Sequence, residues 1–244
     1  MNKRAAGFGI ILTGALLTAL FGDFIWPTRA EPFPVETLSA VPSFDGLLPT
    51  LPARNTGRLG RVGNAWNMAF IGSEEQIIGA LEEAGWTRLA LSIPQSIREG
   101  LAQIVRWERL TKFPPMNLYK LNGRIQDHNW AQVITPIAKR HHFRLWKLPH
   151  IDQKQRYLWW GHGDFDLSVR WHDLSHVPDP DMNMERDHIA GTLKGSRWVE
   201  SLEWRPMAHI PNKGKNDKGY PFFNDGRILL VTLKNPSESS KTLD

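Results

Sequence analysis

The chain contains no cysteine among its 244 residues. This absence excludes disulfide bonds, thiolate catalysis and cysteine-ligated zinc or iron–sulfur sites, and it removes one indicator of the compartment. Long runs of lysine and arginine are also absent, although these residues outnumber aspartate and glutamate by 30 to 25 and the isoelectric point is 9.6. We therefore expect an anionic neighbour, such as lipid headgroups or phosphates, and no nucleic-acid partner.

The common catalytic sequence motifs are missing as well. The chain has no Gly-Lys-Ser/Thr phosphate loop, no Gly-x-Ser-x-Gly motif and no His-Glu-x-x-His motif. Ser168, Ser175 and Ser201 have no sequence feature that marks a nucleophile. The motifs therefore assign no enzyme class, and whether the protein is an enzyme stays open.

The longest apolar segment lies at the N-terminus. Lys3 and Arg4 precede Ala5–Gly22, which has no charged residue and would span about 27 Å as a helix, close to the thickness of a bilayer core. Trp26 follows at the position of an interfacial aromatic anchor. Because positive charge precedes the segment, we expect a single-pass inner-membrane protein with its main domain in the periplasm or extracytoplasmic space. Cleavage as a signal peptide near 28–30 is the alternative, and it also exports the chain.

The remaining sequence divides into three parts after the anchor or signal segment 1–30. Residues 31–61 contain five prolines and no clear periodicity, which predicts an extended linker. Residues 62–234 carry the helix and strand patterns of one folded domain. We expect residues 235–244 to form a disordered tail.

Three helices are expected in the domain. Ser73 and Gln76 form a capping box that opens a helix closed by Gly85. A second helix is expected over about 94–112. Its apolar residues recur at helical spacing, at Ile97, Leu101, Ile104, Val105 and Leu110. Asp179 and Pro180 predict the start of a third helix that ends near residue 194.

Strands are expected over 65–71, 116–121, 140–148, 157–172, 197–204 and 227–234. In the longest of these, apolar and polar residues alternate, so the strand has an apolar face and a polar face. Gly161 and Gly163 would allow a bulge or turn within it. Together these patterns predict an α+β fold, an antiparallel-rich sheet with two to three packed helices, preceded by one transmembrane helix.

Eight of the nine histidines fall between Asp127 and His188. On the expected strand 140–148, alternation places Arg140, His142 and Arg144 on one face, with His141 on the other face among core residues. Two guanidinium groups beside an imidazole suit a phosphate or a carboxylate. The alternative is a solvated strand face or a salt-bridge lattice in which acidic side chains balance the cations. The candidate counter-charges are Asp166, Asp181 and Glu185.

The third expected helix carries a candidate metal site. Asp181, Glu185 and His188 lie at positions i, i+4 and i+7, on one helix face, and Glu-x-x-His is a spacing used in metal sites. A divalent ion such as zinc or manganese is therefore possible, although it is not favoured. The competing interpretation has Asp181 interacting with the helix dipole and Glu185 and His188 forming a surface pair.

Several short segments occur in the same order and at the same spacing as the motifs of a known protein family. They are LNGRIQD at 121–127, RHHFRLW at 140–146, Trp160-Gly161 with Phe165-Asp166, His176, residues 179–187, FFNDGR at 222–227, and Gly85-Trp86. Over residues 64–234 they resemble the LssY C-terminal domain family, which is named for a proposed type I secretion component. The resemblance implies a domain of bacterial membrane proteins with no defined activity. The chain departs from the family at 162–164, where small residues and threonine are usual.

We interpret the sequence as a membrane-tethered envelope protein that binds an anionic partner through residues 140–188. In the enzyme version, the substrate is an envelope phosphate, Arg140 and Arg144 hold the anion, and a carboxylate orients a base. The catalytic candidates are His142, His176 and Asp166. The alternative is a non-catalytic interaction module in a secretion or envelope-maintenance assembly, where Trp and Arg make the contacts.

Overall fold

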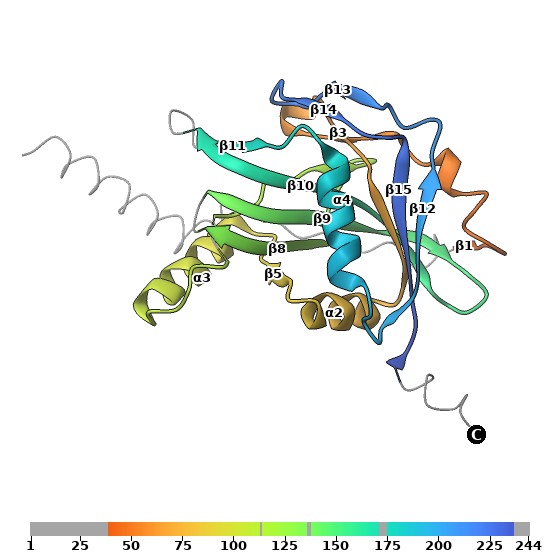
Figure 1. Ribbon diagram of the computed structural model, residues 1–244, viewed down its shortest axis with the longest axis horizontal. Helices are drawn as coiled ribbons and strands as arrows, with labels where there is room; N and C mark the ends of the chain where they lie inside the picture. The colour runs from red at the N-terminus through yellow and green to blue at the C-terminus, as the bar shows by residue number, and fades with distance from the viewer. Residues whose placement is uncertain (1–38, 113, 136–137, 171–174, 237–244) are drawn as a thin grey trace, which may run out of the picture.

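The computed structural model describes residues 39–112, 114–135, 138–170 and 175–236. These residues form an α+β domain in which mixed, mostly antiparallel sheets pack with three α-helices (Figure 1). The membrane segment expected over 5–26 lies outside the described residues. Within the described part of the chain, no helix combines the length and the apolar character needed to cross a membrane.

The main sheet contains nine strands. Its path runs in the order β12, β15, β4, β10, β9, β8 and β5. In that order the bounds are Val199–Pro206, Arg227–Leu233, Met68–Gly72, Tyr157–Arg170, Lys139–Ile151, His128–Thr135 and Thr87–Leu89. Two short strands join it at the sides: β1 (Ser39–Ala40) pairs with β9, and β11 (Ser175–Pro178) pairs with β10. All pairings are antiparallel except β15 with β4 and β1 with β9.

One face of the main sheet is covered by two helices, α2 (Glu74–Glu83) and α4 (Met182–Leu193) (Figure 1). Both insert apolar side chains into a core with β4, β9, β10 and β15. The predicted capping box of α2 is present: Ser73 Oγ accepts from the Gln76 backbone, and the Gln76 side chain accepts from the Ser73 backbone. For α4 the cap lies two residues later than expected, at Asp181, whose side chain accepts from the Asn183 N–H.

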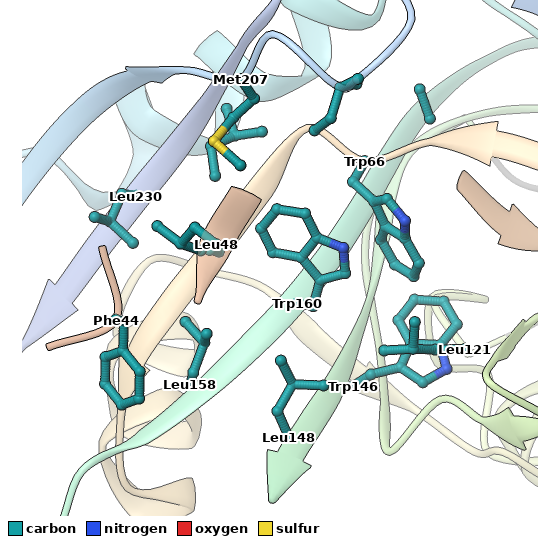
Figure 2. Packing of buried hydrophobic residues seen from close by; sticks show 14 of the residues in the cluster. Phe44, Leu48, Trp66, Leu121, Trp146, Leu148, Leu158, Trp160, Met207 and Leu230 are labelled. Atoms are coloured by element: carbon teal, nitrogen blue, oxygen red, sulfur yellow. The ribbon is translucent and has the colours of Figure 1, made fainter. Parts of the chain in front are cut away.

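The opposite face carries a second core built around tryptophan (Figure 2). Trp66, Trp146 and Trp160 are fully buried, and the Trp66 ring meets the Trp146 ring edge-on with centroids 5.0 Å apart. A small sheet borders this core, with strands in the order β3 (Val62–Ala65), β2 (Arg54–Thr56), β6 (Lys120–Leu121) and β7 (Arg124–Ile125). The hairpin of β13 (Lys213–Lys215) and β14 (Pro221–Phe223) completes the strands.

The structure corrects the linker prediction for the part of 31–61 that it describes. Residues 39–61 include β1, β2 and two 3-10 turns, η2 (Leu48–Thr50) and η3 (Arg58–Gly60). Phe44 and Leu48 are buried in the tryptophan-rich core, where Figure 2 shows them beside Leu158 and Leu230. The prolines of this segment suggested a linker. Because Phe44 and Leu48 pack in the core, residues 39–61 belong to the folded domain.

The second helix, α3 (Ile93–Val105), forms as predicted but ends earlier and packs differently. An amphipathic helix normally turns its apolar stripe toward the core. Here Pro94, Ser96, Gly100 and Gln103 are buried, whereas Ile104 and Val105 are 60% and 78% exposed.

The glycines of β10 are explained by close packing and not by a turn. The strand runs without interruption from Tyr157 to Arg170. A Cβ at Gly161 would lie 2.5 Å from Met68 Cγ, and one at Gly163 would lie 2.8 Å from Met68 Cε and 3.2 Å from Glu185 Cγ. The missing side chains therefore leave room for Met68 of β4 and for helix α4 against the sheet.

Candidate functional site

The candidate site begins with the register of β9 against β10. Arg140 pairs with Asp166, His142 with Asp164, and Arg144 with His162. Because alternate residues of a strand share a face and paired residues lie side by side, all six side chains emerge on one face. This is the face of the tryptophan-rich core, and the polar ladder continues the sheet beyond Trp146 and Trp160.

The predicted grouping of Arg140, His142 and Arg144 on one strand face is therefore confirmed, and the alternative of a solvated strand face does not hold. The three residues are only 5%, 4% and 3% exposed. Phe143 and Leu145 on the other face are fully buried beneath the helices, as expected. Because both sides of the sheet are covered, the polar ladder lies inside the domain.

A small pocket of about 30 Å³ brings these polar side chains together. Arg140, His142 and Arg144 line it, with Asp164 and Asp166 of β10 and His176 of β11. The remaining polar lining comes from segments distant in the sequence: Asn64, Asn117, Tyr119, Asn216 and Lys218. Three of the catalytic or anion-binding candidates on β9 thus converge with His176 and Asp166.

Asp166 is the centre of the ion pairs in this pocket. Its Oδ2 accepts from Arg140 Nε at 3.1 Å and lies 3.0 Å from His176 Nδ1 and 3.4 Å from His142 Nδ1. Burial by itself would raise the pKa of Asp166, but His142, His176 and Arg140 together hold that pKa well below its usual range. Asp166 is therefore ionised at neutral pH, and it is the counter-charge of the cluster.

His142 is neutral at physiological pH. Burial lowers its pKa to about 3, and the positive charges of Arg140 and Arg144 add to this effect against the opposing attraction of Asp166. A neutral imidazole between two guanidinium groups removes most of the repulsion that three cations on one face would cause. His142 is consequently a poor general acid at neutral pH, since it holds no proton to donate.

Asp164 belongs to a separate hydrogen-bonded group at the inner end of the pocket. Its Oδ2 lies 2.7 Å from His162 Nε2 and accepts from Asn64 Nδ2 at 2.9 Å. His162 Nδ1 lies 2.8 Å from the Ala65 carbonyl oxygen, and Nε2 also lies 2.8 Å from Asn64 Nδ2. Residues 162–164, the segment that departs from the family pattern, thus form an internal polar network.

The hydrogen-bonding capacity of Arg144 is incompletely used, as is that of His142 Nδ1. Its Nε donates to the Asn117 carbonyl oxygen at 3.1 Å, and its guanidinium carbon lies 4.7 Å from the centre of the Tyr119 ring. Nη1 is buried and has no hydrogen-bond partner among the described residues. Tyr119 in turn donates its hydroxyl to Asp217 at 2.9 Å. A buried guanidinium donor without an acceptor is uncommon in folded proteins.

The predicted metal set does not assemble. Asp181 caps α4, Glu185 is buried against the opposite face of the sheet, and His188 Nε2 lies 3.0 Å from Gln132 Oε1. Among the described residues, no group of three or more His, Asp or Glu side chains has a geometry suited to a metal ion. Helical spacing placed these residues on neighbouring turns, but Asp181 caps the helix whereas Glu185 and His188 both contact His141. Of the three proposed counter-charges, only Asp166 pairs with a cation of β9, namely Arg140.

A second polar cluster lies on the helix-covered face, where His141 joins Glu185 and His188, which the sequence pattern had grouped without it. His141 Nδ1 lies 2.6 Å from Glu185 Oε2, and the His141 and His188 rings stack with centroids 3.6 Å apart. Burial, followed by the charges of Asp164 and Asp166, raises the pKa of Glu185 well above its usual value. Burial lowers the pKa of His141 to about 4, with a contribution from His188. The pair is therefore neutral overall, and it supports the prediction that His141 is structural.

The sequence also gave no indication of Asn64, Tyr119 or Lys218 in the pocket. These residues come from β3, from the segment before β6 and from the loop between β13 and β14. Burial lowers the pKa of Lys218, and the nearby charge of Arg144 lowers it further. Short strands and loops carry too little periodicity to predict which face a residue occupies.

A family model described as LssY C-terminus matches residues 48–228. The match begins at Leu48, a core residue of the segment first interpreted as a linker. It includes Arg140, His142 and Arg144. Comparisons with curated proteins and with solved structures gave no match. Since the match covers most of the sequence, the chain belongs to the LssY C-terminus family.

Proposed function

We propose that this chain is a single-pass inner-membrane protein whose domain, on the periplasmic side, binds a ligand bearing a phosphate or carboxylate group. The single observation that carries the proposal is the buried Nη1 of Arg144, which has no hydrogen-bond partner among the described residues and belongs to a residue lining the pocket. Leaving such a donor unsatisfied costs about 1–3 kcal/mol or more. An anionic oxygen in the pocket would satisfy it through a charge-assisted hydrogen bond.

The charge balance of the pocket supports one anionic group as ligand. Arg140 is already engaged, because it donates to Asp166 and also to the Pro114 carbonyl oxygen at 2.7 Å. Arg144 and Lys218 are the remaining cations in the lining. A pocket of about 30 Å³ has room for the charged end of a ligand and leaves the rest of the ligand outside. Phosphate esters and carboxylates both meet this description.

The enzyme version of the proposal is hydrolysis of a phosphate-bearing envelope substrate. The short contact between His176 Nδ1 and Asp166 Oδ2 resembles a carboxylate-oriented imidazole, whose other nitrogen could accept a proton from water. His142 contributes less to proton transfer in this version, since its pKa lies near 3. Arg144 would bind the phosphate, and Arg140 would keep Asp166 ionised.

The alternative is a non-catalytic interaction module in a secretion or envelope-maintenance assembly. The small size of the pocket favours it, because an acidic side chain or the C-terminal carboxylate of a partner would fill a space of this volume. In this version Asp166 and Arg140 serve stability alone, and Arg144 anchors the partner.

The test is calorimetric titration of the full-length chain in detergent with inorganic phosphate and with acetate. We expect binding of at least one, and we expect Arg144→Gln to weaken it by about 10–150-fold, the equivalent of one charge-assisted hydrogen bond. The matched control is Arg205→Gln, because Arg205 forms ion pairs with Glu203 and Asp45 outside this pocket. Equal binding by all three proteins, or no binding by the wild type, would refute the proposal.

The enzyme version has its own readout. His176→Gln should abolish hydrolysis of a chromogenic phosphate ester while phosphate binding persists. Binding without any hydrolysis by the wild type favours the interaction module.

A further inference from the structure

The C-terminal end of α3 exposes a cluster of large apolar side chains. Ile104 and Val105 are 60% and 78% exposed, and Trp107, just beyond the helix, is 96% exposed. Figure 1 shows α3 at the end of the sheet where β8 finishes, with its tip at the periphery of the domain. Isolated exposed apolar residues are ordinary, but three within four positions are a patch that needs a cause.

The packing of α3 explains why this patch faces outward. The buried side of the helix is small or polar: Ser96 Oγ donates to the Lys112 carbonyl oxygen, and Gln103 Oε1 accepts from the backbone N–H groups of Thr111 and Lys112. The segment that follows α3 thus folds back along its polar side. The apolar stripe is left half-buried at Ile97 and exposed at Ile104.

The backbone at Trp107 adds an independent observation. Trp107 has φ +56°, and it occupies the residue after the helix cap: its N–H donates to the Ile104 carbonyl oxygen, and the Glu108 N–H donates to that of Gln103. This is the Schellman arrangement, in which glycine is the usual residue at the left-handed position. A bulky side chain is disfavoured there, and at 96% exposure it gains almost no packing in return. The domain alone would be more stable with glycine at this position.

Two arginines flank the patch, with the exposed carboxylate of Glu108 between Trp107 and Arg109. Arg106 and Arg109 are both exposed, whereas Lys112 on the returning segment forms an ion pair with Glu99. Tryptophan favours the headgroup region of a bilayer because its ring is apolar and its N–H is polar, and arginine is attracted to anionic lipid. A helix end with apolar side chains between arginines fits a membrane surface better than it fits an aqueous environment.

The position of the N-terminal segment makes this contact reachable. Ser39, where the described chain begins, pairs with His150 at the far end of β9, whereas α3 lies at the other end of the sheet (Figure 1). Thirteen steps of the chain separate Trp26 from Ser39, which reach about 45 Å at most. The 13 residues of β9 span a similar length, about 43 Å. When the strands lie parallel to the membrane, the β1 end and the α3 end of the sheet can therefore both reach the membrane surface.

We propose that Ile104, Val105 and Trp107, flanked by Arg106 and Arg109, form a docking surface that inserts into the headgroup region of an anionic lipid bilayer. The surface is distinct from the polar pocket. It holds the domain against the membrane in which, under the proposed function, the N-terminal segment is anchored. The strain at Trp107 is retained because its side chain contributes to the lipid-bound state and not to folding.

Because the chain has no cysteine, a single introduced cysteine can be labelled uniquely. The experiment places a nitroxide on Glu108→Cys, beside Trp107, in the full-length chain reconstituted into phosphatidylcholine vesicles with added phosphatidylglycerol. The matched control is Met184→Cys on α4, which is 58% exposed. We expect the label at 108 to collide more often with oxygen than with a water-soluble nickel chelate. The label at 184 should show the opposite preference.

Adding Trp107→Gly should remove the protection at 108 and should raise the urea midpoint of unfolding, because glycine relieves the left-handed backbone. A label at 108 that is as accessible to water as the label at 184 would overturn the proposal. A label at 108 that collides rarely with both oxygen and the nickel chelate would also overturn it, since a protein segment would then cover the patch. A lower urea midpoint for Trp107→Gly would show that Trp107 serves the fold.

Discussion

Asp166→Asn should destabilise the domain by about 3 kcal/mol, because it leaves a buried guanidinium without its counter-charge. Arg140 and Asp166 have side chains only 6% and 4% exposed, and Nε lies 3.1 Å from Oδ2. Breaking one partner of a buried pair typically costs about 3–5 kcal/mol. The lower end applies here because the asparagine oxygen can still accept a hydrogen bond, and Arg140 keeps its bond to Pro114.

The assay is urea unfolding of both proteins at neutral pH, followed by far-ultraviolet circular dichroism and compared through the midpoint and slope. The matched control is Glu203→Gln, which removes a carboxylate from an exposed ion pair with Arg205 and should cost less than about 0.5 kcal/mol. A loss for Asp166→Asn no larger than that of the control would refute the reasoning. Equal loss would mean that the buried ladder is hydrated in solution.

The pH dependence gives a second check on the same pair. The pKa of Asp166 is depressed in the folded state, so its contribution is fully present above the unfolded value of about 3.9. That contribution is lost as pH falls through the folded pKa. The stability difference between wild type and Asp166→Asn should therefore stay constant from pH 5 to about 8 and shrink only in strong acid.

Two further predictions concern His142 and the glycines. Because the pKa of His142 falls to about 3 on folding, the unfolded chain binds more protons between pH 6.5 and 3. The free energy of unfolding should therefore decline by up to about 1.4 kcal/mol for each unit that the pH falls across that range. In His142→Phe the urea midpoint should depend less on pH. Gly161→Ala should cost about 1–3 kcal/mol, since its Cβ would lie 2.5 Å from Met68 Cγ. The control Gly191→Ala, in open space on α4, should stabilise by about 0.5–1 kcal/mol; equal effects would contradict the packing argument.

Local sequence chemistry was enough to predict several elements of this domain. The Ser73 and Gln76 capping box opens α2 as expected, because both halves of that motif lie within one helical turn. Alternation on 140–148 correctly separated Arg140, His142 and Arg144 from Phe143 and Leu145. Such predictions depend on strand and helix periods alone, and long segments repeat the period often enough to reveal it.

The candidate site depended on contacts that no local pattern contains. Asp166 and Arg140 lie 26 residues apart in the chain, and Lys218 reaches the same pocket from a loop near the C-terminus. Asp181, Glu185 and His188 do not converge for the same reason, because neighbours on a helix can face different partners once the helix is docked.

The sequence by itself determined the family, the helices and the side chains that share each strand face, because these follow from local chemistry and spacing. Only the tertiary structure decided what covers each face. The polar ladder is buried because β3, the chain around Tyr119 and the β13–β14 loop close over it. The apolar stripe of α3 is exposed because the helix is covered along its polar side by the segment that follows it. Periodicity identifies which residues point together, whereas burial is set by distant segments that arrive only when the chain folds.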